Sequence, residues 1–198
     1  NKKAQIALAT ISTAAGVVVF LSGTLTVEAL SSGNSTHASA DSTGTGVLAG
    51  GVLLTEAVID GATTAAANGD VRAGGLTVRA ETGNNAFAET ESFQLGLASF
   101  SGAGTLARVS TLAAVRATVA ETVLIVGGPV TVSAAADNAA TATSDAASGG
   151  TLSLSVNLQL AELLAETRAQ FDGDVENGGA VTIQASAINT ASASADVF

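Results

Sequence analysis

Several residue types are missing from this chain of 198 residues. It has no cysteine, methionine, tryptophan or tyrosine, and it has one proline and one histidine. The absence of cysteine excludes disulfides and thiolate metal sites. Phenylalanine, with six copies, is the only aromatic residue, so a core built on many large rings is not available. The interior must instead be narrow and lined with Ala, Val, Leu and Thr.

Basic residues are also scarce, with seven Lys and Arg against 17 Asp and Glu, a formal net charge of −10. This balance excludes nucleic acid as a partner, because binding to phosphates depends on Lys and Arg. It also disfavours an anionic membrane surface, and we attribute the acidity to solubility. The lone His37 has no partners in the sequence for a catalytic triad, so we expect it to face solvent and the protein not to be an enzyme.

A glycine-rich turn followed by a short strand occurs four times, typically as Gly-Gly-x-Val-Thr-Val-x-Ala. Its threonine stands at positions 26, 77, 131 and 182, at spacings of 51, 54 and 51 residues. Such a period is the signature of a repeat architecture. We divide the single segment 1–198 into a partial repeat 1–22, repeats 23–74, 75–127 and 128–178, and a partial repeat 179–198.

Within each repeat the alternation of side chains is that of a strand. It places an aliphatic column on one face and a polar column, which includes Glu28 and Arg79, on the solvent face. Alternating alanines follow, and they require a closely packed opposite wall. The stretch 158–168 has leucines near helical spacing, but the repeat frame predicts strand there. The aliphatic column consists of Val27, Val78, Val132 and Ile183.

These features predict an all-β fold, a parallel β-helix (β-solenoid) in which stacked coils cover one another's apolar faces. A second, less regular glycine break inside each repeat divides it into parts of about 22 and 29 residues. We therefore expect the ~52-residue repeat to make two coils of unequal length, and the chain to form about seven to eight coils.

An asparagine follows the first strand of each repeat, at Asn34, Asn85, Asn138 and Asn189. Asparagine tolerates left-handed backbone and caps turns, so these four residues are predicted to be structural turn positions. In a stacked fold, like asparagines can also form a ladder between coils.

One loop is a candidate metal site. Asp172, Asp174 and Glu176 alternate through a glycine-containing segment, as oxygen ligands of Ca²⁺ do. The loop is shorter than a full calcium-binding motif, and its counterpart near Asp70 has one acid. The competing interpretation is an acidic surface turn, and no other cofactor is predicted.

Residues 4–21 form an apolar run behind Lys2 and Lys3, which could indicate a targeting segment. We favour a partial repeat, with no membrane span, because the run resembles the stretch before Gly127. The repeat pattern continues to both ends of the sequence. This predicts end-to-end self-association or continuation in a longer chain.

The pattern of Gly-Gly-x-Val-Thr-Val-x-Ala, Asn, alternating Ala and a second Gly-Gly resembles the repeats of giant bacterial surface proteins. These are the filamentous haemagglutinin-like and leukotoxin-type filamentous adhesins. The resemblance implies a β-helical shaft, export to the extracellular bacterial cell surface, and a role in attachment to another cell surface or to glycan. The alternative is a soluble solenoid module that binds glycan or ice, although regular Thr-x-Thr rows for ice occur only at 24–26 and 141–143.

Overall fold

The computed structural model describes residues 7–11, 18–177 and 179–197, and these are almost entirely β-strand. One short 3₁₀ helix, η1, occupies Thr111–Ala113. The strands are β1 Ala7–Ile11, β2 Val19–Ile59, β3 Thr63–Ala67, β4 Val71–Val109, β5 Val115–Val119, β6 Val123–Val126, β7 Val130–Gly149, β8 Leu152–Leu163, β9 Thr167–Phe171, β10 Asp174–Glu176 and β11 Val181–Val197.

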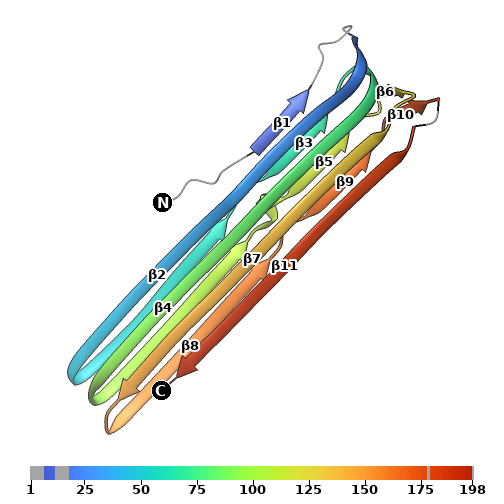
Figure 1. Cartoon of the computed structure of the whole chain (residues 1–198). Helices are drawn as coiled ribbons and strands as arrows, with labels where there is room; N and C mark the ends of the chain where they lie inside the picture. The colour runs from blue at the N-terminus through green and yellow to red at the C-terminus, as the bar shows by residue number, and fades with distance from the viewer. Residues whose placement is uncertain (1–6, 12–17, 178, 198) are drawn as a thin grey trace.

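The chain runs in long flattened circuits (Figure 1). In each circuit it travels along one wall, turns at a far end, and comes back along a second wall toward a near end. The outgoing wall contains the first parts of β2 and β4, followed by β7 and β11. The return wall contains the last parts of β2 and β4 with β8, and then β3, β5 and β9. The far turns lie near residues 46, 96 and 150, and the near end includes β6 and β10.

Neighbouring circuits are joined by parallel pairing along both walls. Thr26 pairs with Thr77, Thr77 with Thr131, and Thr131 with Thr182, at the spacing of the sequence repeat. On the return wall Leu48 pairs with Ala98, and Ala98 with Leu152. A curled, parallel, all-β architecture is therefore present, as the sequence predicts.

The predicted division of each repeat into two coils needs correction. All paired residues in the described strands are 50 to 56 positions apart, so one repeat makes one circuit, not two coils. The described chain therefore passes along the outgoing wall four times, instead of forming the seven to eight coils that were predicted. The second glycine break, at Gly149 and Gly150, is the far turn. Each part of a repeat supplies one wall, so the two parts face each other across the interior.

Glycines stand where a circuit passes close to the backbone of the preceding one. A Cβ added at Gly128 would lie 1.6 Å from the carbonyl oxygen of Gly74, and one at Gly179 would lie 1.7 Å from that of Gly128. At the far turn, a Cβ on Gly150 would lie 1.8 Å from the carbonyl oxygen of Gly96. The glycine motifs are therefore required by the close stacking of the turns.

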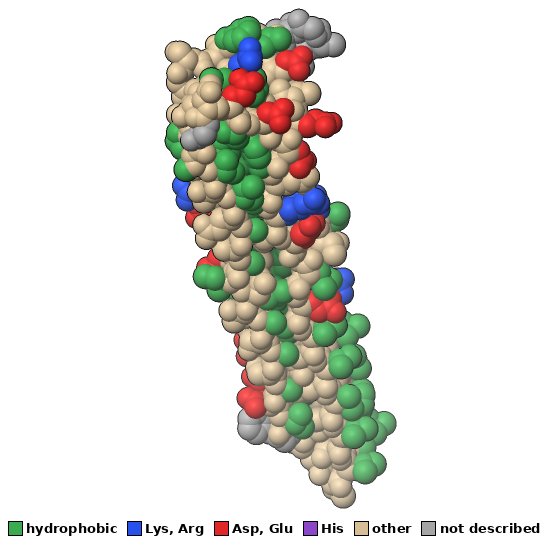
Figure 2. Space-filling view, turned by 90° about the vertical axis from the view of Figure 1, so that its right-hand side faces the viewer, with side chains coloured by type: hydrophobic (Ala, Val, Ile, Leu, Met, Phe, Trp, Pro, Cys, Tyr) green, Lys and Arg blue, Asp and Glu red, His purple; other side chains and the backbone are tan. Residues whose placement is uncertain are grey.

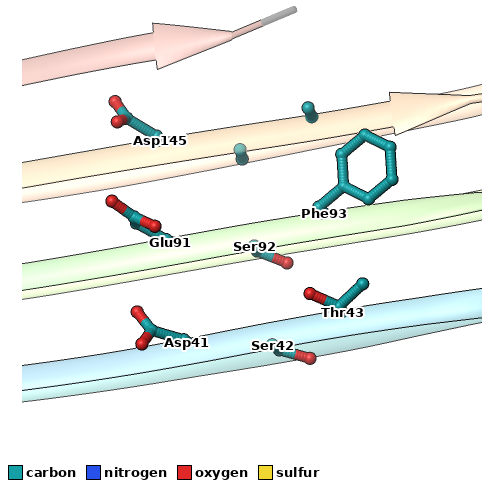
Figure 3. A pocket seen from close by; sticks show the side chains of 9 residues that line it. Asp41, Ser42, Thr43, Glu91, Ser92, Phe93 and Asp145 are labelled. Carbon is teal, nitrogen blue, oxygen red and sulfur yellow. The ribbon is translucent and has the colours of Figure 1, made fainter.

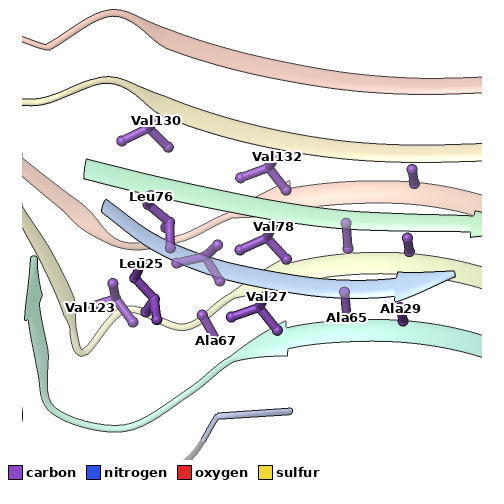
Figure 4. Close-up of a cluster of buried hydrophobic side chains, with 14 of the residues drawn as sticks. Leu25, Val27, Ala29, Ala65, Ala67, Leu76, Val78, Val123, Val130 and Val132 are labelled. Carbon is purple, nitrogen blue, oxygen red and sulfur yellow. The ribbon is translucent and has the colours of Figure 1, made fainter. Parts of the chain in front are cut away.

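The near half of the interior is apolar (Figure 4). Val27, Val78 and Val132 stack in one inward row and are all buried, as the alternation predicts. They belong to a cluster that also contains Val119 of β5 and Ile125 of β6. Burying each aliphatic side chain stabilises the fold by about 1.5–3 kcal/mol. The equivalent Ile183 is 50% exposed because it lies in β11, the last strand of the sheet order.

Toward the far end the interior narrows and becomes polar. Ala86, Ala88, Ala140 and Ala142 are fully buried and face the return wall, which explains the alternating alanines. Beyond them most of the inward residues are Ser, Thr or Gln, with Ala103 and Ala146 buried among them. The hydroxyls of Thr55 and Thr90 lie 2.6 Å apart, and the amide of the buried Gln94 donates to Ser42 at 3.3 Å. Of the stretch 158–168, predicted to be strand, residues 158–163 and 167–168 are strand and residues 164–166 are not.

Candidate functional site

An asparagine ladder runs through four neighbouring strands. The side-chain amide of Asn34 donates to Asn84 at 3.0 Å, Asn84 to Asn138 at 2.8 Å, and Asn138 to Asn189 at 2.9 Å. Asn84 and Asn138 are almost completely buried. Asn84 and Asn138 each donate and accept along the row, so these buried polar groups satisfy one another. The ladder therefore links circuits through the interior.

The predicted set of asparagines differs from this ladder in two respects. Asn85 is exposed and pairs in register with Ser35 and Ala139, and Asn84 occupies the ladder position. All the predicted asparagines lie within strands, so the turn assignment is wrong. Only Asn34 stands beside an irregularity, a register shift that includes Gly33 at φ +75°. Continuous parallel pairing leaves no room for a turn at these positions.

The candidate calcium residues do not converge. Asp174 and Glu176 lie in β10, which pairs with β6. Glu176 faces Arg72 at 3.9 Å, and Asp172 accepts a hydrogen bond from Gln170. Within the described residues, no three His, Asp or Glu side chains are grouped as metal ligands. All three carboxylates are exposed on the surface, and that of Glu176 lies beside an arginine.

A row of carboxylates on the outer side of the outgoing wall was not anticipated. Asp41, Glu91, Asp145 and Asp196 occupy equivalent positions in β2, β4, β7 and β11, and all are exposed. Figure 3 shows the first three side by side on their strands, where they border a shallow depression of about 230 Å³ next to Phe93. The spacings of 50, 54 and 51 residues could have revealed the row, because they match the repeat.

His37 faces solvent, as predicted, with 59% of its side chain exposed. Its ring packs edge-on against Phe87, and its Nε2 lies 4.0 Å from a carboxylate oxygen of Glu89. Thr36, Glu56 and Arg108 line an open hollow near it. Arg108, which also lines the hollow, is paired with Glu162 at 2.6 Å.

No family model matches this chain, and no curated protein or solved structure does so either. Among the described residues there is no helix with the length and apolar character needed to cross a membrane. The features that recur from circuit to circuit are the two glycine columns, the asparagine ladder and the acidic row. The glycine columns and the ladder lie at contacts between circuits, and the acidic row lies on their outer surface.

Proposed function

We propose that this chain is a length of structural shaft in an extracellular bacterial fibre or filamentous adhesin, where it supports attachment and performs no catalysis. The chain would form a segment of β-solenoid in which each circuit is a template for the next. The observation that carries the proposal is the asparagine ladder, which continues through β2, β4, β7 and β11 in one register.

A shaft needs contacts that can be repeated without limit along its axis. Parallel pairing supplies backbone hydrogen bonds along both walls, and the ladder adds side-chain bonds in the same direction. The outgoing wall, about 25 residues long, gives each circuit a width of roughly 80 Å at ~3.3 Å per residue. Such a shaft would be a flat ribbon that grows by ~4.8 Å with each added circuit.

Immunogold electron microscopy tests the location and the shape together. Antibodies raised against this chain should label flat fibres on the surface of intact producing cells. Labelling confined to the cell interior would contradict the proposal.

The competing role as a soluble glycan- or ice-binding module is tested with the purified chain on a glycan array and in an ice recrystallisation assay. Strong activity in either assay, together with no surface fibres, would replace the shaft by that module.

A further inference from the structure

The far half of the return wall carries large apolar side chains on its outer side. Along β2, from Leu48 to Val58, side chains point alternately outward and inward. The side chains of Leu48, Val52 and Leu54 point outward. Those of Ala49, Leu53 and Thr55 point inward. We call the outward positions of 48–54, 98–104 and 152–158 the apolar face. Figure 2 shows hydrophobic side chains gathered at the lower end of one side of the molecule, where this face lies.

The exposure of this face is high for such side chains. Leu48 is 81% exposed, Leu54 80% and Leu158 73%. At 99–101 and 153–159 the inward positions are polar, and the hydroxyl of Ser155 lies 2.8 Å from those of both Ser101 and Ser148. Polarity is therefore reversed here, with hydroxyls inside and leucines outside. This reversal leaves an apolar surface without a partner.

The apolar face is continuous across three strands. Its middle strand, β4, has Gly102 and Gly104 where its neighbours have Val52 and Leu54. A Cβ on Gly104 would lie 2.5 Å from the Leu54 side chain, and one on Gly102 would lie 3.2 Å from Val52. The neighbouring side chains thus extend over the glycines.

We propose that the apolar face is the docking surface for a second copy of this chain, packed face to face across a two-fold axis. Eight large apolar side chains of this face are 40–81% exposed in each copy, so face-to-face packing would remove all of them from water together. Two sheets pack in this way at a separation of ~10 Å. In a two-fold dimer each copy presents the same rows of outward side chains to the other, and the spacing between strands is the same in both copies.

The charge distribution favours this occupant over a lipid surface. The acidic row of Asp41, Glu91 and Asp145 lies on the outgoing wall, so pairing through the return wall leaves these carboxylates in solvent. An anionic bilayer would be repelled by the net charge of −10. The positions of the apolar face itself carry no charge, so two copies can approach there with little desolvation of ionic groups.

Sedimentation equilibrium of the purified chain at micromolar concentrations tests the proposal. The wild type should be dimeric, and Leu158→Glu and Leu48→Glu should each raise the dimer dissociation constant at least ~100-fold, because a carboxylate would be buried without a partner. The matched control is Leu30→Glu, at a leucine that is 54% exposed on the outgoing wall, and it should leave the constant unchanged. Unchanged far-ultraviolet circular dichroism should verify that each variant is folded.

Three results would overturn the proposal. The first is a wild type that stays monomeric at millimolar concentration. The second is a dimer that survives both substitutions, which would indicate association through a sheet edge. The third is a monomer that binds phosphatidylcholine vesicles and loses this binding with Leu158→Glu, which would make the face a lipid surface. None of these results bears on whether the chain is exported, so this proposal and the proposed function can fail separately.

Discussion

Single side chains in this molecule act through their equivalents in neighbouring circuits. Asn84 is the clearest example, because it donates to Asn138 and accepts from Asn34. Its sequence neighbour Asn85 points outward and is exposed. Two adjacent residues of the same type thus have different roles, and the difference can be measured.

Replacing Asn84 by Ala should lower the free energy of unfolding by about 1–3 kcal/mol, because the buried carbonyl oxygen of Asn138 loses its donor and the amide of Asn34 keeps only Thr82 as an acceptor. Chemical denaturation monitored by circular dichroism measures this loss. Asn85→Ala is the control and should change stability by less than about 0.5 kcal/mol. Equal effects of the two substitutions would mean that the ladder does not stabilise the fold.

The acidic row has the opposite effect on stability. Asp41, Glu91 and Asp145 are stacked in register on neighbouring strands, and like charges placed side by side repel each other. Glu91→Gln should therefore raise the unfolding free energy by about 0.5 kcal/mol at low salt, and 1 M NaCl should remove most of that gain. Glu121→Gln, in an exposed turn outside the row, should have no such salt-dependent effect. A gain that persists at high salt would exclude charge repulsion as its cause.

At the scale of elements, the turns determine how closely the walls can stack. Gly128 faces a carbonyl oxygen of the preceding circuit, which leaves no space for a Cβ. Gly128→Ala should destabilise the protein by about 3 kcal/mol or more, because the backbones of two circuits would have to separate.

Thermal unfolding of Gly128→Ala should be compared with that of Gly83→Ala. Gly83 lies within β4, and an added Cβ would come no closer than 3.8 Å to any atom outside its neighbours. That substitution should be neutral or slightly stabilising, since alanine has less conformational freedom than glycine in the unfolded chain. Similar losses at both positions would show that glycine at the turn serves flexibility rather than close packing.

For the whole molecule, the change from an aliphatic interior to a hydroxyl-lined one predicts a gradient of local stability. β4 has a neighbouring strand on both sides at 76–80 and at 98–104. Amides at 98–104 should exchange with solvent at least ~10-fold faster than those at 76–80, because less apolar area is buried there. Hydrogen exchange followed by mass spectrometry measures this, and equal protection of the two segments would contradict it.

The sequence by itself was sufficient to predict the strand type, the period and the inward columns, because these depend on local alternation and on spacing. It also contained the correct asparagine: the 54-residue interval from Thr77 to Thr131 also links Asn84 to Asn138. In repeat 23–74 the interval from Thr26 to Asn34 is one residue longer because of the irregularity at Gly33, and this obscured the alignment. The acidic row could be found from the same spacings.

Only the tertiary structure decided that the two parts of a repeat face each other, and which side of the far return strand points inward. A strand such as 152–158 alternates leucine or valine with serine or asparagine, and alternation alone favours leucine inside. The narrow space between the walls reverses this choice. It accommodates small hydroxyls that bond across the gap, as Ser155 does with Ser148, and the larger leucines are left on the outer face.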